Sequence, residues 1–299
     1  MIRCAIFLAI LTCNPALAAP RIAFTFDDLP AHAPLPPGVS RVDVARDTIA
    51  ALREAKVPSV LGFVNGVGLV NEPQSAPVLQ MWRDAGFLLG NHTWSHAHLS
   101  GNTLQEYETE ITRNEPALEK SSPDADWHWF RYPYLDEGDS PEQRAAIRSF
   151  LTERGYKIAP VTMGFSDWQY SEPYARCAAN NDAAAIAEME KMYLAAAEES
   201  IPYGRSLSQT LYGRDIPYVL LMHIGAFEAR MMGQLLALYR AKGFEFVSLE
   251  EAERDPYYRA FADPSQPAPL PDLEHQVWAQ GGQVPRLTDY APRLKAICR

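Results

Sequence analysis

Short apolar segments alternate with segments of helical periodicity along most of this 299-residue sequence, and this alternation limits the possible folds more than any other feature. Seven strands separated by helices indicate parallel βαβ units. A closed or nearly closed α/β barrel and an open doubly wound sheet both fit this pattern. No GxGxxG motif follows the first strand, which disfavours a dinucleotide-binding fold. The strands are expected at residues 21–26, 59–64, 87–90, 127–131, 156–163, 218–223 and 244–249.

Local signals place the helices between these strands. Ser40 is a typical N-cap, and Thr103 with Glu106 three residues later forms a capping box. Gly residues follow several helical segments, as is common at helix C-termini. We expect the helix after Thr103 to end near Pro116. The other helices are expected after Ser40 and at about 76–84, 140–155, 182–199 and 227–242.

Composition and charge are those of a globular protein. Hydrophobic residues make up 47% of the chain and charged residues 21%, which excludes a disordered or collagen-like chain. Lys and Arg number 27 against 37 Asp and Glu, a formal net charge of −10. A nucleic-acid partner is therefore disfavoured, because phosphate binding requires a basic surface.

The first eighteen residues have the features of a secretory signal peptide. Arg3 is followed by the apolar run 5–12, which is too short to span a membrane, and Ala16-Leu17-Ala18 is a typical cleavage site. A buried first strand or helix is one alternative. A lipoprotein anchored through Cys13 is another, although Thr12 is unfavourable just before a lipidated cysteine. We expect export to the periplasm or the medium, a catalytic domain at 19–254 and an irregular, Pro-rich extension at 255–299.

Two cysteines remain after the predicted cleavage, Cys177 and Cys298. An even number of cysteines in an oxidising compartment suggests pairing, so we predict a disulfide that ties the C-terminus to the middle of the chain. A loop of this length would stabilise the fold by about 4–5 kcal/mol in the chain-entropy model. Two unpaired thiols are the alternative.

Polar residues follow several of the predicted strands, where parallel α/β folds place their sites. The first strand ends in Asp27 and Asp28, whose charges would repel each other unless one binds a cation. A simple turn before Pro30 is the alternative. The third strand leads into His92, His96 and His98, three of the seven histidines in the chain. His92 and His96 would share a face if this segment were helical, whereas His98 would point elsewhere.

Asp28, His92 and His96 together would form a two-histidine, one-carboxylate metal site with open positions. Such a set suits iron in oxygen chemistry, or zinc, cobalt or nickel in hydrolysis. Arg131, at the end of the fourth strand, could orient a carboxylate by two parallel hydrogen bonds or lie in a surface salt bridge. Ser166-Asp167-Trp168 and His223 follow later strands, and His223 suits a general acid.

These motifs, in this order, resemble the polysaccharide deacetylase family of metal-dependent carbohydrate esterases. Thr25-Phe26-Asp27-Asp28 matches the first family motif, His92 to His96 the second, and Arg131-Tyr132-Pro133-Tyr134 the third. Asp167-Trp168 and Val219 to His223 match the less specific fourth and fifth motifs. The resemblance covers about residues 20–250 and implies a distorted (β/α) barrel, usually with seven strands.

The resemblance also implies a role for each residue. Asp28, His92 and His96 would bind the metal, often zinc. Asp27, held by Arg131, would take a proton from the attacking water, and His223 would protonate the leaving amine. Asp167 would orient His223 or Arg131. The backbone N–H of Tyr134 would complete the oxyanion site, and Trp168 and Leu221 would contact the acetyl methyl group.

The substrate implied is an acetylated glycan or oligosaccharide. A related carbon–nitrogen hydrolase of small non-sugar amides and a non-catalytic glycan-binding protein are the alternatives, and the second is disfavoured by the intact Asp27 and His223. The segment 169–217 is longer than the motifs require and could cover the site. The sequence fixes neither the native metal nor the oligomeric state, and it contains no transmembrane segment.

Overall fold

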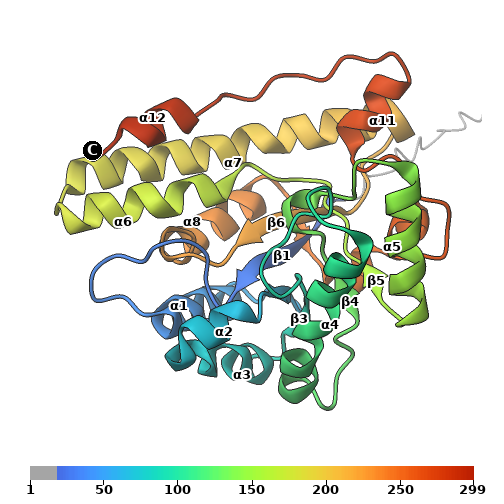
Figure 1. Ribbon diagram of the computed structural model, residues 1–299. Coiled ribbons are helices and arrows are strands. Elements are labelled where there is room, and N and C mark those ends of the chain that lie inside the picture. The colour runs from blue at the N-terminus through green and yellow to red at the C-terminus, as the bar shows by residue number, and fades with distance from the viewer. Residues whose placement is uncertain (1–18) are drawn as a thin grey trace, which may run out of the picture.

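The computed structural model describes residues 19–299, so the predicted signal peptide at 1–18 lies outside the described residues. Among the described residues, no helix combines the length and the apolar character needed to cross a membrane. The chain folds around one mixed α/β core, with helices packed on the outside of a central sheet (Figure 1).

The sheet has seven strands, and all of its pairings are parallel. Their order is β5-β4-β3-β2-β1-β6, and β7 pairs with the start of β1. The sheet curls, and Met163, beyond β5, forms a bridge with Leu220 of β6 at its other edge. This curled half-barrel confirms the predicted distorted (β/α) barrel, rather than an open doubly wound sheet. The strands are β1 (Arg21–Leu29), β2 (Leu61–Val64), β3 (Leu88–Asn91), β4 (Trp129–Phe130), β5 (Lys157–Ile158), β6 (Tyr218–His223) and β7 (Glu245–Phe246).

The helices begin where the capping signals predict. Ser40 and Asp43 form a capping box at the start of α1, and Thr103 with Glu106 does the same for α4. The α-helices are α1 (Arg41–Glu54), α2 (Val67–Asn71), α3 (Pro77–Asp84), α4 (Leu104–Ser121), α5 (Pro141–Glu153), α6 (Ser171–Ala179), α7 (Ala183–Tyr212), α8 (Ala226–Ala241), α9 (Leu249–Ala252), α10 (Arg259–Ala262), α11 (Leu273–Ala279) and α12 (Ala291–Ala296). Short 3₁₀ helices are η1 (Pro73–Ser75), η2 (Pro133–Leu135), η3 (Asp167–Tyr170) and η4 (Pro256–Tyr258).

Two predicted helix ends are wrong. The helix α4 continues past Pro116 to Ser121, and α7 continues past Pro202 to Tyr212. A proline removes one hydrogen bond from the helix, but buried side chains on both sides of it keep the helix packed on the core. In α4 these are Ile111 and Leu118. The predicted strands at 127–131, 156–163 and 244–249 also shorten to two paired residues each.

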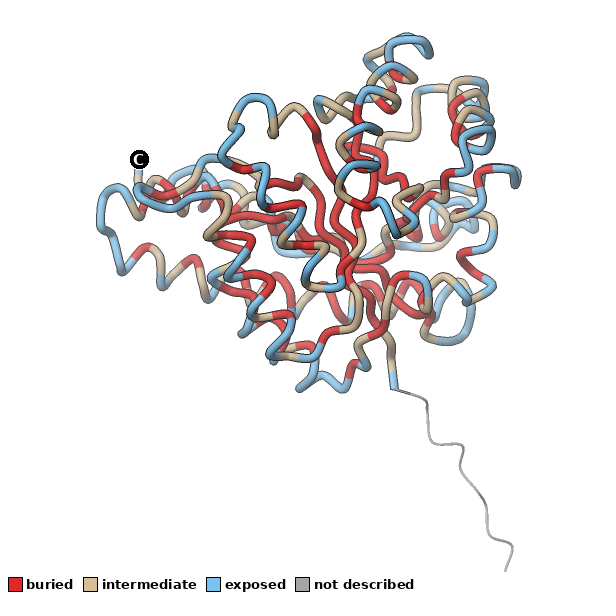
Figure 2. Tube along the Cα trace, turned by 90° about the horizontal axis from the view of Figure 1, so that it is seen from below, coloured by how far each residue is buried: buried red, intermediate tan, exposed pale blue. Residues whose placement is uncertain are grey.

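The core lies between the sheet and its helices, and it positions the ends of the central strands. Phe24, Phe26, Leu220 and Met222 of β1 and β6 are almost fully buried. Figure 2 shows the buried residues concentrated along these central strands, with the exposed residues on the surrounding helices and loops. A rigid, apolar pair of strands therefore carries the polar residues that follow at their carboxyl ends.

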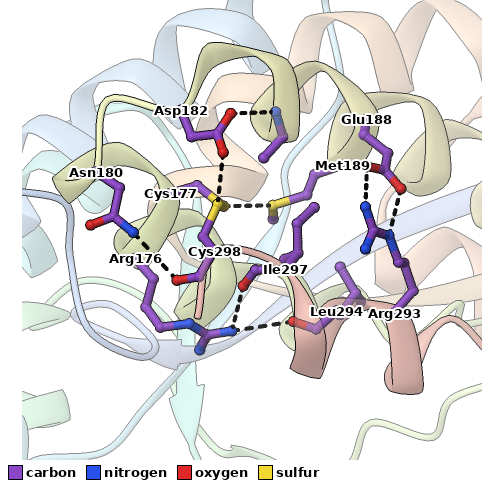
Figure 3. The surroundings of a disulfide bond; sticks show 11 residues. Arg176, Cys177, Asn180, Asp182, Glu188, Met189, Arg293, Leu294, Ile297 and Cys298 are labelled. Atoms are coloured by element: carbon purple, nitrogen blue, oxygen red, sulfur yellow. Dashed lines mark hydrogen bonds and ion pairs between the residues drawn. A yellow bond between two sulfur atoms is a disulfide. The ribbon is translucent and has the colours of Figure 1, made fainter.

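The C-terminal segment lies along α7, from α11 at one end of this helix to α12 at the other (Figure 1). This segment is partly helical, and not irregular throughout as predicted from its proline content. The predicted disulfide between Cys177 and Cys298 is present and joins α6 to the C-terminus across 121 residues (Figure 3). Around it, Arg176 donates hydrogen bonds to the carbonyl oxygens of Leu294 and Ile297. These contacts fasten the end of the chain to the α6–α7 hairpin.

Candidate active site

A cavity of about 650 Å³ opens at the carboxyl ends of the central strands. Most of the residues predicted for the site line it, together with an apolar wall from the β1–α1 loop and the start of α2. The lining residues are Asp27, Asp28, Leu29, Pro30, Ala31, His32, Ala33, Asn65, Val67, Gly68, His92, His96, Tyr134, Leu135, Trp168, Leu221 and His223. No described residue of segment 169–217 lines the cavity, because α6 and α7 pack against α8 instead.

Asp27 and Asp28 end the apolar part of β1 but face different partners. Asp27 is 3% exposed and accepts a hydrogen bond from Arg131. Asp28 has a backbone φ of 68°, a left-handed conformation that aspartate tolerates better than most residues. Its Oδ2 lies 2.8 Å from Nδ1 of His32, whereas its buried Oδ1 has no hydrogen-bond partner among the described residues. The alternative that these aspartates only form a turn does not account for this arrangement.

The Nε2 atoms of His92 and His96 both lie near Oδ1 of Asp28. The distances to Oδ1 are 3.6 Å from His92 and 3.4 Å from His96. We expected these two histidines to share a face only if their segment were helical, and the segment is not helical. Thr93 and His96 have positive φ values of 61° and 60°, and this turned loop brings the two imidazoles together.

A buried amide network holds the histidine loop. Asn65 donates a hydrogen bond to the carbonyl oxygen of Thr93 at 3.0 Å. Asn114, on α4, donates to Asn91 Oδ1, and the same oxygen accepts the backbone N–H of Thr93. The sequence alone did not identify these asparagines, because their contacts join segments that lie far apart in the chain.

The side chains of Asp28, His92 and His96 fit a divalent metal ion. One ligand atom from each lies within 4.8 Å of the others, and the set of two imidazoles and one carboxylate is typical of open catalytic metal sites. The orphaned Oδ1 of Asp28 supports this interpretation, since a buried carboxylate oxygen normally has a partner. The protonation state of His96 also suits the binding of a cation. Burial lowers the pKa of His96 to about 4, so its imidazole is neutral near pH 7.

Opposing effects act on Asp28. Burial alone would raise the pKa of Asp28, but the hydrogen bond with His32 and the nearby imidazoles of His223, His92 and His96 lower it. The net result is a pKa well below the usual range, so this carboxyl group is ionised. An ionised carboxylate is the form that coordinates a metal.

Arg131 lies inside the protein, and the alternative of a surface salt bridge is wrong because its side chain is 1% exposed. Its Nη1 lies 3.3 Å and 3.4 Å from the two oxygens of Asp27. A single nitrogen of Arg131 therefore lies within hydrogen-bond distance of both oxygens of Asp27. We had predicted two parallel hydrogen bonds from two different nitrogens. Its other nitrogens donate to Ala159 O and Thr25 Oγ1. Burial lowers the pKa of Arg131, whereas the charge of Asp27 raises it.

His223 is bound to Asp167, which answers whether Asp167 orients His223 or Arg131. Asp167 Oδ1 lies 2.9 Å from His223 Nδ1, and Asp167 Oδ2 accepts the His223 backbone N–H at 2.7 Å. Burial would lower the pKa of His223, but the Asp167 carboxylate raises it to about 10. His223 is therefore protonated near neutral pH, as a general acid must be.

Aromatic side chains form the rim of the cavity. Tyr134 is 60% exposed, has a φ of 57°, and meets the His96 ring edge-on at 4.3 Å between centroids. His98 stacks on the Tyr134 ring at 3.6 Å between centroids, and its Nδ1 lies 3.1 Å from Asp136, so it points away from the metal ligands, as predicted. Trp168 is 48% exposed, and Leu221 lies within the cavity.

His32 is the one polar residue of the cavity on the β1–α1 loop, and the sequence reasoning missed it. It lies four residues after Asp28, and its ring centroid is 5.2 Å from that of His223. A histidine that follows two carboxylates is a weak signal. The loop 30–40 has no periodicity from which the direction of this side chain could be predicted.

The fold and the site define a hydrolase-like α/β barrel with a possible metal centre formed by two imidazoles and one carboxylate. Residues 15–150 match the family model described as polysaccharide deacetylase. This match confirms the resemblance to polysaccharide deacetylases that is seen in the motifs.

Solved structures share this fold. Peptidoglycan deacetylase PdaC from Bacillus subtilis matches with a TM-score of 0.51 and 19% identity, over 81% of this chain and 95% of PdaC. A family 4 carbohydrate esterase from Streptomyces lividans, in complex with acetate, matches with a TM-score of 0.50 and 20% identity, over 79% and 97%. BA3943 from Bacillus anthracis, a pseudoenzyme of the same esterase family, matches with a TM-score of 0.53 and 13% identity, over 79% and 66%. At these identities the matches show the fold, and the family supports deacetylase activity.

Proposed function

We propose that this protein is a metal-dependent hydrolase that removes acetyl groups from N-acetylated, or O-acetylated, sugars of a glycan or oligosaccharide. The observation that carries the proposal is the pairing of Asp27 with His223 as direct neighbours on β1 and β6. One is a buried carboxylate beside Arg131, and the other is an imidazole whose pKa is raised to about 10. A base and an acid thus flank the three possible metal ligands.

Asp28, His92 and His96 would hold the metal, which we take to be zinc in view of their donor atoms, with cobalt and nickel as alternatives. When bound, the ion would polarise the acyl carbonyl and make a water molecule more acidic. Asp27 takes a proton from the attacking water as the water oxygen forms a bond to the acyl carbon. Arg131 keeps the Asp27 carboxylate in place by its hydrogen bond.

His223 completes the reaction by donating its proton to the leaving nitrogen, or oxygen, as the bond to the acyl carbon breaks. The products are acetate and the free amine or hydroxyl of the sugar. Asp167 keeps Nδ1 of His223 occupied, so Nε2 is the atom left to carry the transferred proton. The backbone N–H of Tyr134 would stabilise the negative charge on the acyl oxygen.

Residues at the rim and wall of the cavity would recognise the acyl group and the sugar. Leu221 lies inside the cavity and offers an apolar contact for the acetyl methyl group. The exposed Trp168 and Tyr134 offer flat apolar faces beside it, as a sugar ring requires. These contacts support a sugar substrate without choosing among peptidoglycan, chitin oligomers and acetylated hemicellulose.

BA3943 shares this fold and is a pseudoenzyme, so the fold alone does not ensure catalysis. In the present chain Asp27, Asp28, His92, His96 and His223 lie together in one cavity, which supports an active enzyme. A small non-sugar amide remains the alternative substrate, because much of the cavity wall is apolar.

Release of acetate by the purified, zinc-loaded protein tests the proposal. The panel contains N-acetylglucosamine oligomers, peptidoglycan fragments, acetylated xylan and simple amides, each with and without a chelator. Release from a sugar substrate that the chelator abolishes is the expected result. Release from simple amides alone would favour the alternative substrate, and no release by a zinc-bound protein would overturn the proposal.

We also propose that the protein is exported, with residues 1–18 removed, a catalytic domain at 19–254 and an extension at 255–299. The Cys177–Cys298 disulfide supports this, since disulfides persist in oxidising compartments. N-terminal sequencing of protein recovered from the periplasm or the medium tests the cleavage after Ala18.

A further inference from the structure

The contact between His32 and Asp28 stands outside the sequence motifs of the site. His32 Nδ1 lies 2.8 Å from Asp28 Oδ2, and both side chains are largely shielded from solvent. We propose that His32 is a positioning residue that fixes the Asp28 carboxylate and thereby sets the affinity of the site for its metal ion. This inference rests on the proposed function, because it takes Asp28 as a metal ligand.

The two carboxylate oxygens of Asp28 face different partners. The Oδ1 atom faces His92 and His96 and has no hydrogen-bond partner in the part of the chain that the structure describes, whereas Oδ2 is turned toward His32. A carboxylate held at one oxygen cannot rotate freely about its Cβ–Cγ bond. His32 therefore holds Oδ1 in the direction of the two imidazoles before any ion arrives, and a preorganised ligand loses less entropy on binding.

A second ligand is held in the same manner. His92 Nδ1 lies 2.8 Å from the carbonyl oxygen of Arg131, which leaves His92 Nε2 facing Asp28. Metal ligands commonly have such outer partners, which fix their orientation. The carbonyl of Arg131 orients His92 in this way, and the imidazole of His32 orients Asp28.

His32 itself is held by the backbone of its loop. Its N–H donates to the carbonyl oxygen of Ile224, next to His223, at 2.6 Å. The preceding carbonyl, of Ala31, accepts a hydrogen bond from Arg41, the first residue of α1. Arg41 in turn binds both carboxylate oxygens of Glu72, at 2.8 Å and 2.7 Å. Figure 1 shows that the rest of this loop, between β1 and α1, extends away from the sheet, so these contacts fix the end that carries His32.

Substitutions at His32 separate positioning from folding. His32→Phe keeps a flat ring of similar size and removes the hydrogen bond to Asp28. His32→Asn restores a side-chain N–H close to the position of Nδ1. His128→Leu is the matched control, because His128 Nδ1 also contacts an aspartate, Asp126, outside the cavity. His32→Leu is measured beside His32→Phe, so that the failure of one variant to fold still leaves a variant without the hydrogen bond.

The measurement is the Kd for zinc, obtained by competition with a chromophoric chelator, together with the Tm of each metal-free protein. His32→Phe and His32→Leu are expected to weaken zinc binding about 10- to 100-fold with metal-free Tm values close to that of the wild type. His32→Asn is expected to recover most of this affinity, and His128→Leu to bind as the wild type does.

Wild-type affinity in His32→Phe or His32→Leu would overturn the inference, as would an equal loss in His128→Leu. Acetate release is measured on the same samples, so the two proposals can be told apart. Zinc binding that depends on His32, without acetate release from any substrate, would support the inference and contradict the proposed function. A wild-type protein that binds no zinc would contradict both.

Discussion

Asp167 holds His223 at two points, with Oδ1 at 2.9 Å from the ring Nδ1 and Oδ2 accepting the backbone N–H at 2.7 Å. The ring and the strand end that carries it are therefore fixed by one buried carboxylate. Because this carboxylate is the main reason that the pKa of His223 rises to about 10, the two residues act as one acidic unit.

The first prediction concerns the pH dependence of this unit. His223 is the proton donor, so its protonated form is required and kcat/KM should fall as the pH rises through its pKa. Asp167→Asn removes the charge that raises this pKa, and the alkaline limb should move to lower pH by about one unit or more. The pH–rate profiles of the two proteins test this. An alkaline limb that stays in place in Asp167→Asn would show that another group controls it.

The second prediction separates the base from the metal ligands. Asp27 accepts a hydrogen bond from Arg131 but is not one of the three possible metal ligands. Asp27→Asn should therefore lower kcat by about 10²- to 10⁴-fold, the usual contribution of a general base. Its zinc content should equal that of the wild type. A variant with wild-type kcat would remove Asp27 from the mechanism.

The third prediction tests the metal ligands with two histidines of the same motif. His92→Ala removes one of the two imidazoles that face Asp28 Oδ1 and should abolish stoichiometric zinc binding. His98→Ala is its control, because His98 is stacked on Tyr134 and turned toward Asp136. Zinc content by atomic absorption distinguishes the two variants. A full complement of zinc in His92→Ala would contradict the ligand set.

Much of the fold could be predicted because its signals are local. The N-cap at Ser40, the capping box at Thr103 and the apolar strands β1 and β6 depend on neighbouring residues alone, and all were predicted, although β1 continues past the expected end at residue 26 to Leu29. The predicted helix ends near Pro116 and at residue 199 were wrong, because packing on the core outweighs the hydrogen bond lost at Pro116 and at Pro202.

The residues of the site also divide into those that local sequence signals identify and those that depend on distant segments. Asp27, His92 and His223 could be identified as candidates because each stands at or near the end of an apolar strand. The backbone turn that joins His92 to His96 and the direction of His32 depend on contacts from other segments. The carbonyl of Ile224, for example, fixes His32 across 192 residues of sequence. Such contacts leave no periodic pattern in the chain.

The fourth prediction concerns the disulfide. Cys298→Ser should lower the free energy of unfolding by about 2–5 kcal/mol, because the bond closes a loop of 121 residues. Neither cysteine lines the cavity, so KM for the preferred substrate should change little at 25 °C. Denaturant unfolding of the variant and of the wild type measures the difference. Equal midpoints in both proteins would show that the non-covalent contacts of Arg176 and Asn180 hold the terminus on their own.

The fifth prediction concerns Glu228, a fully buried glutamate near the start of α8. Its Oε2 accepts a hydrogen bond from Ser171, whereas its Oε1 has no hydrogen-bond partner within residues 19–299. Burial raises the pKa of Glu228, and the charge of Asp167 raises it further. The folded state therefore binds this proton more tightly than the unfolded state does. Between the ordinary and the raised pKa, stability must fall as the pH rises.

Glu228→Gln keeps the shape and an acceptor for Ser171 but removes the ionisable group. Its Tm should exceed that of the wild type by about 2–5 °C at pH 8–9, and the difference should shrink toward pH 4, where the wild-type carboxyl is mostly neutral in both states. Glu245→Gln, at an exposed position of β7, is the control and should leave the Tm unchanged at either pH. A Glu228→Gln protein less stable than the wild type at pH 9 would mean that the ionised carboxylate is stabilised in the folded protein.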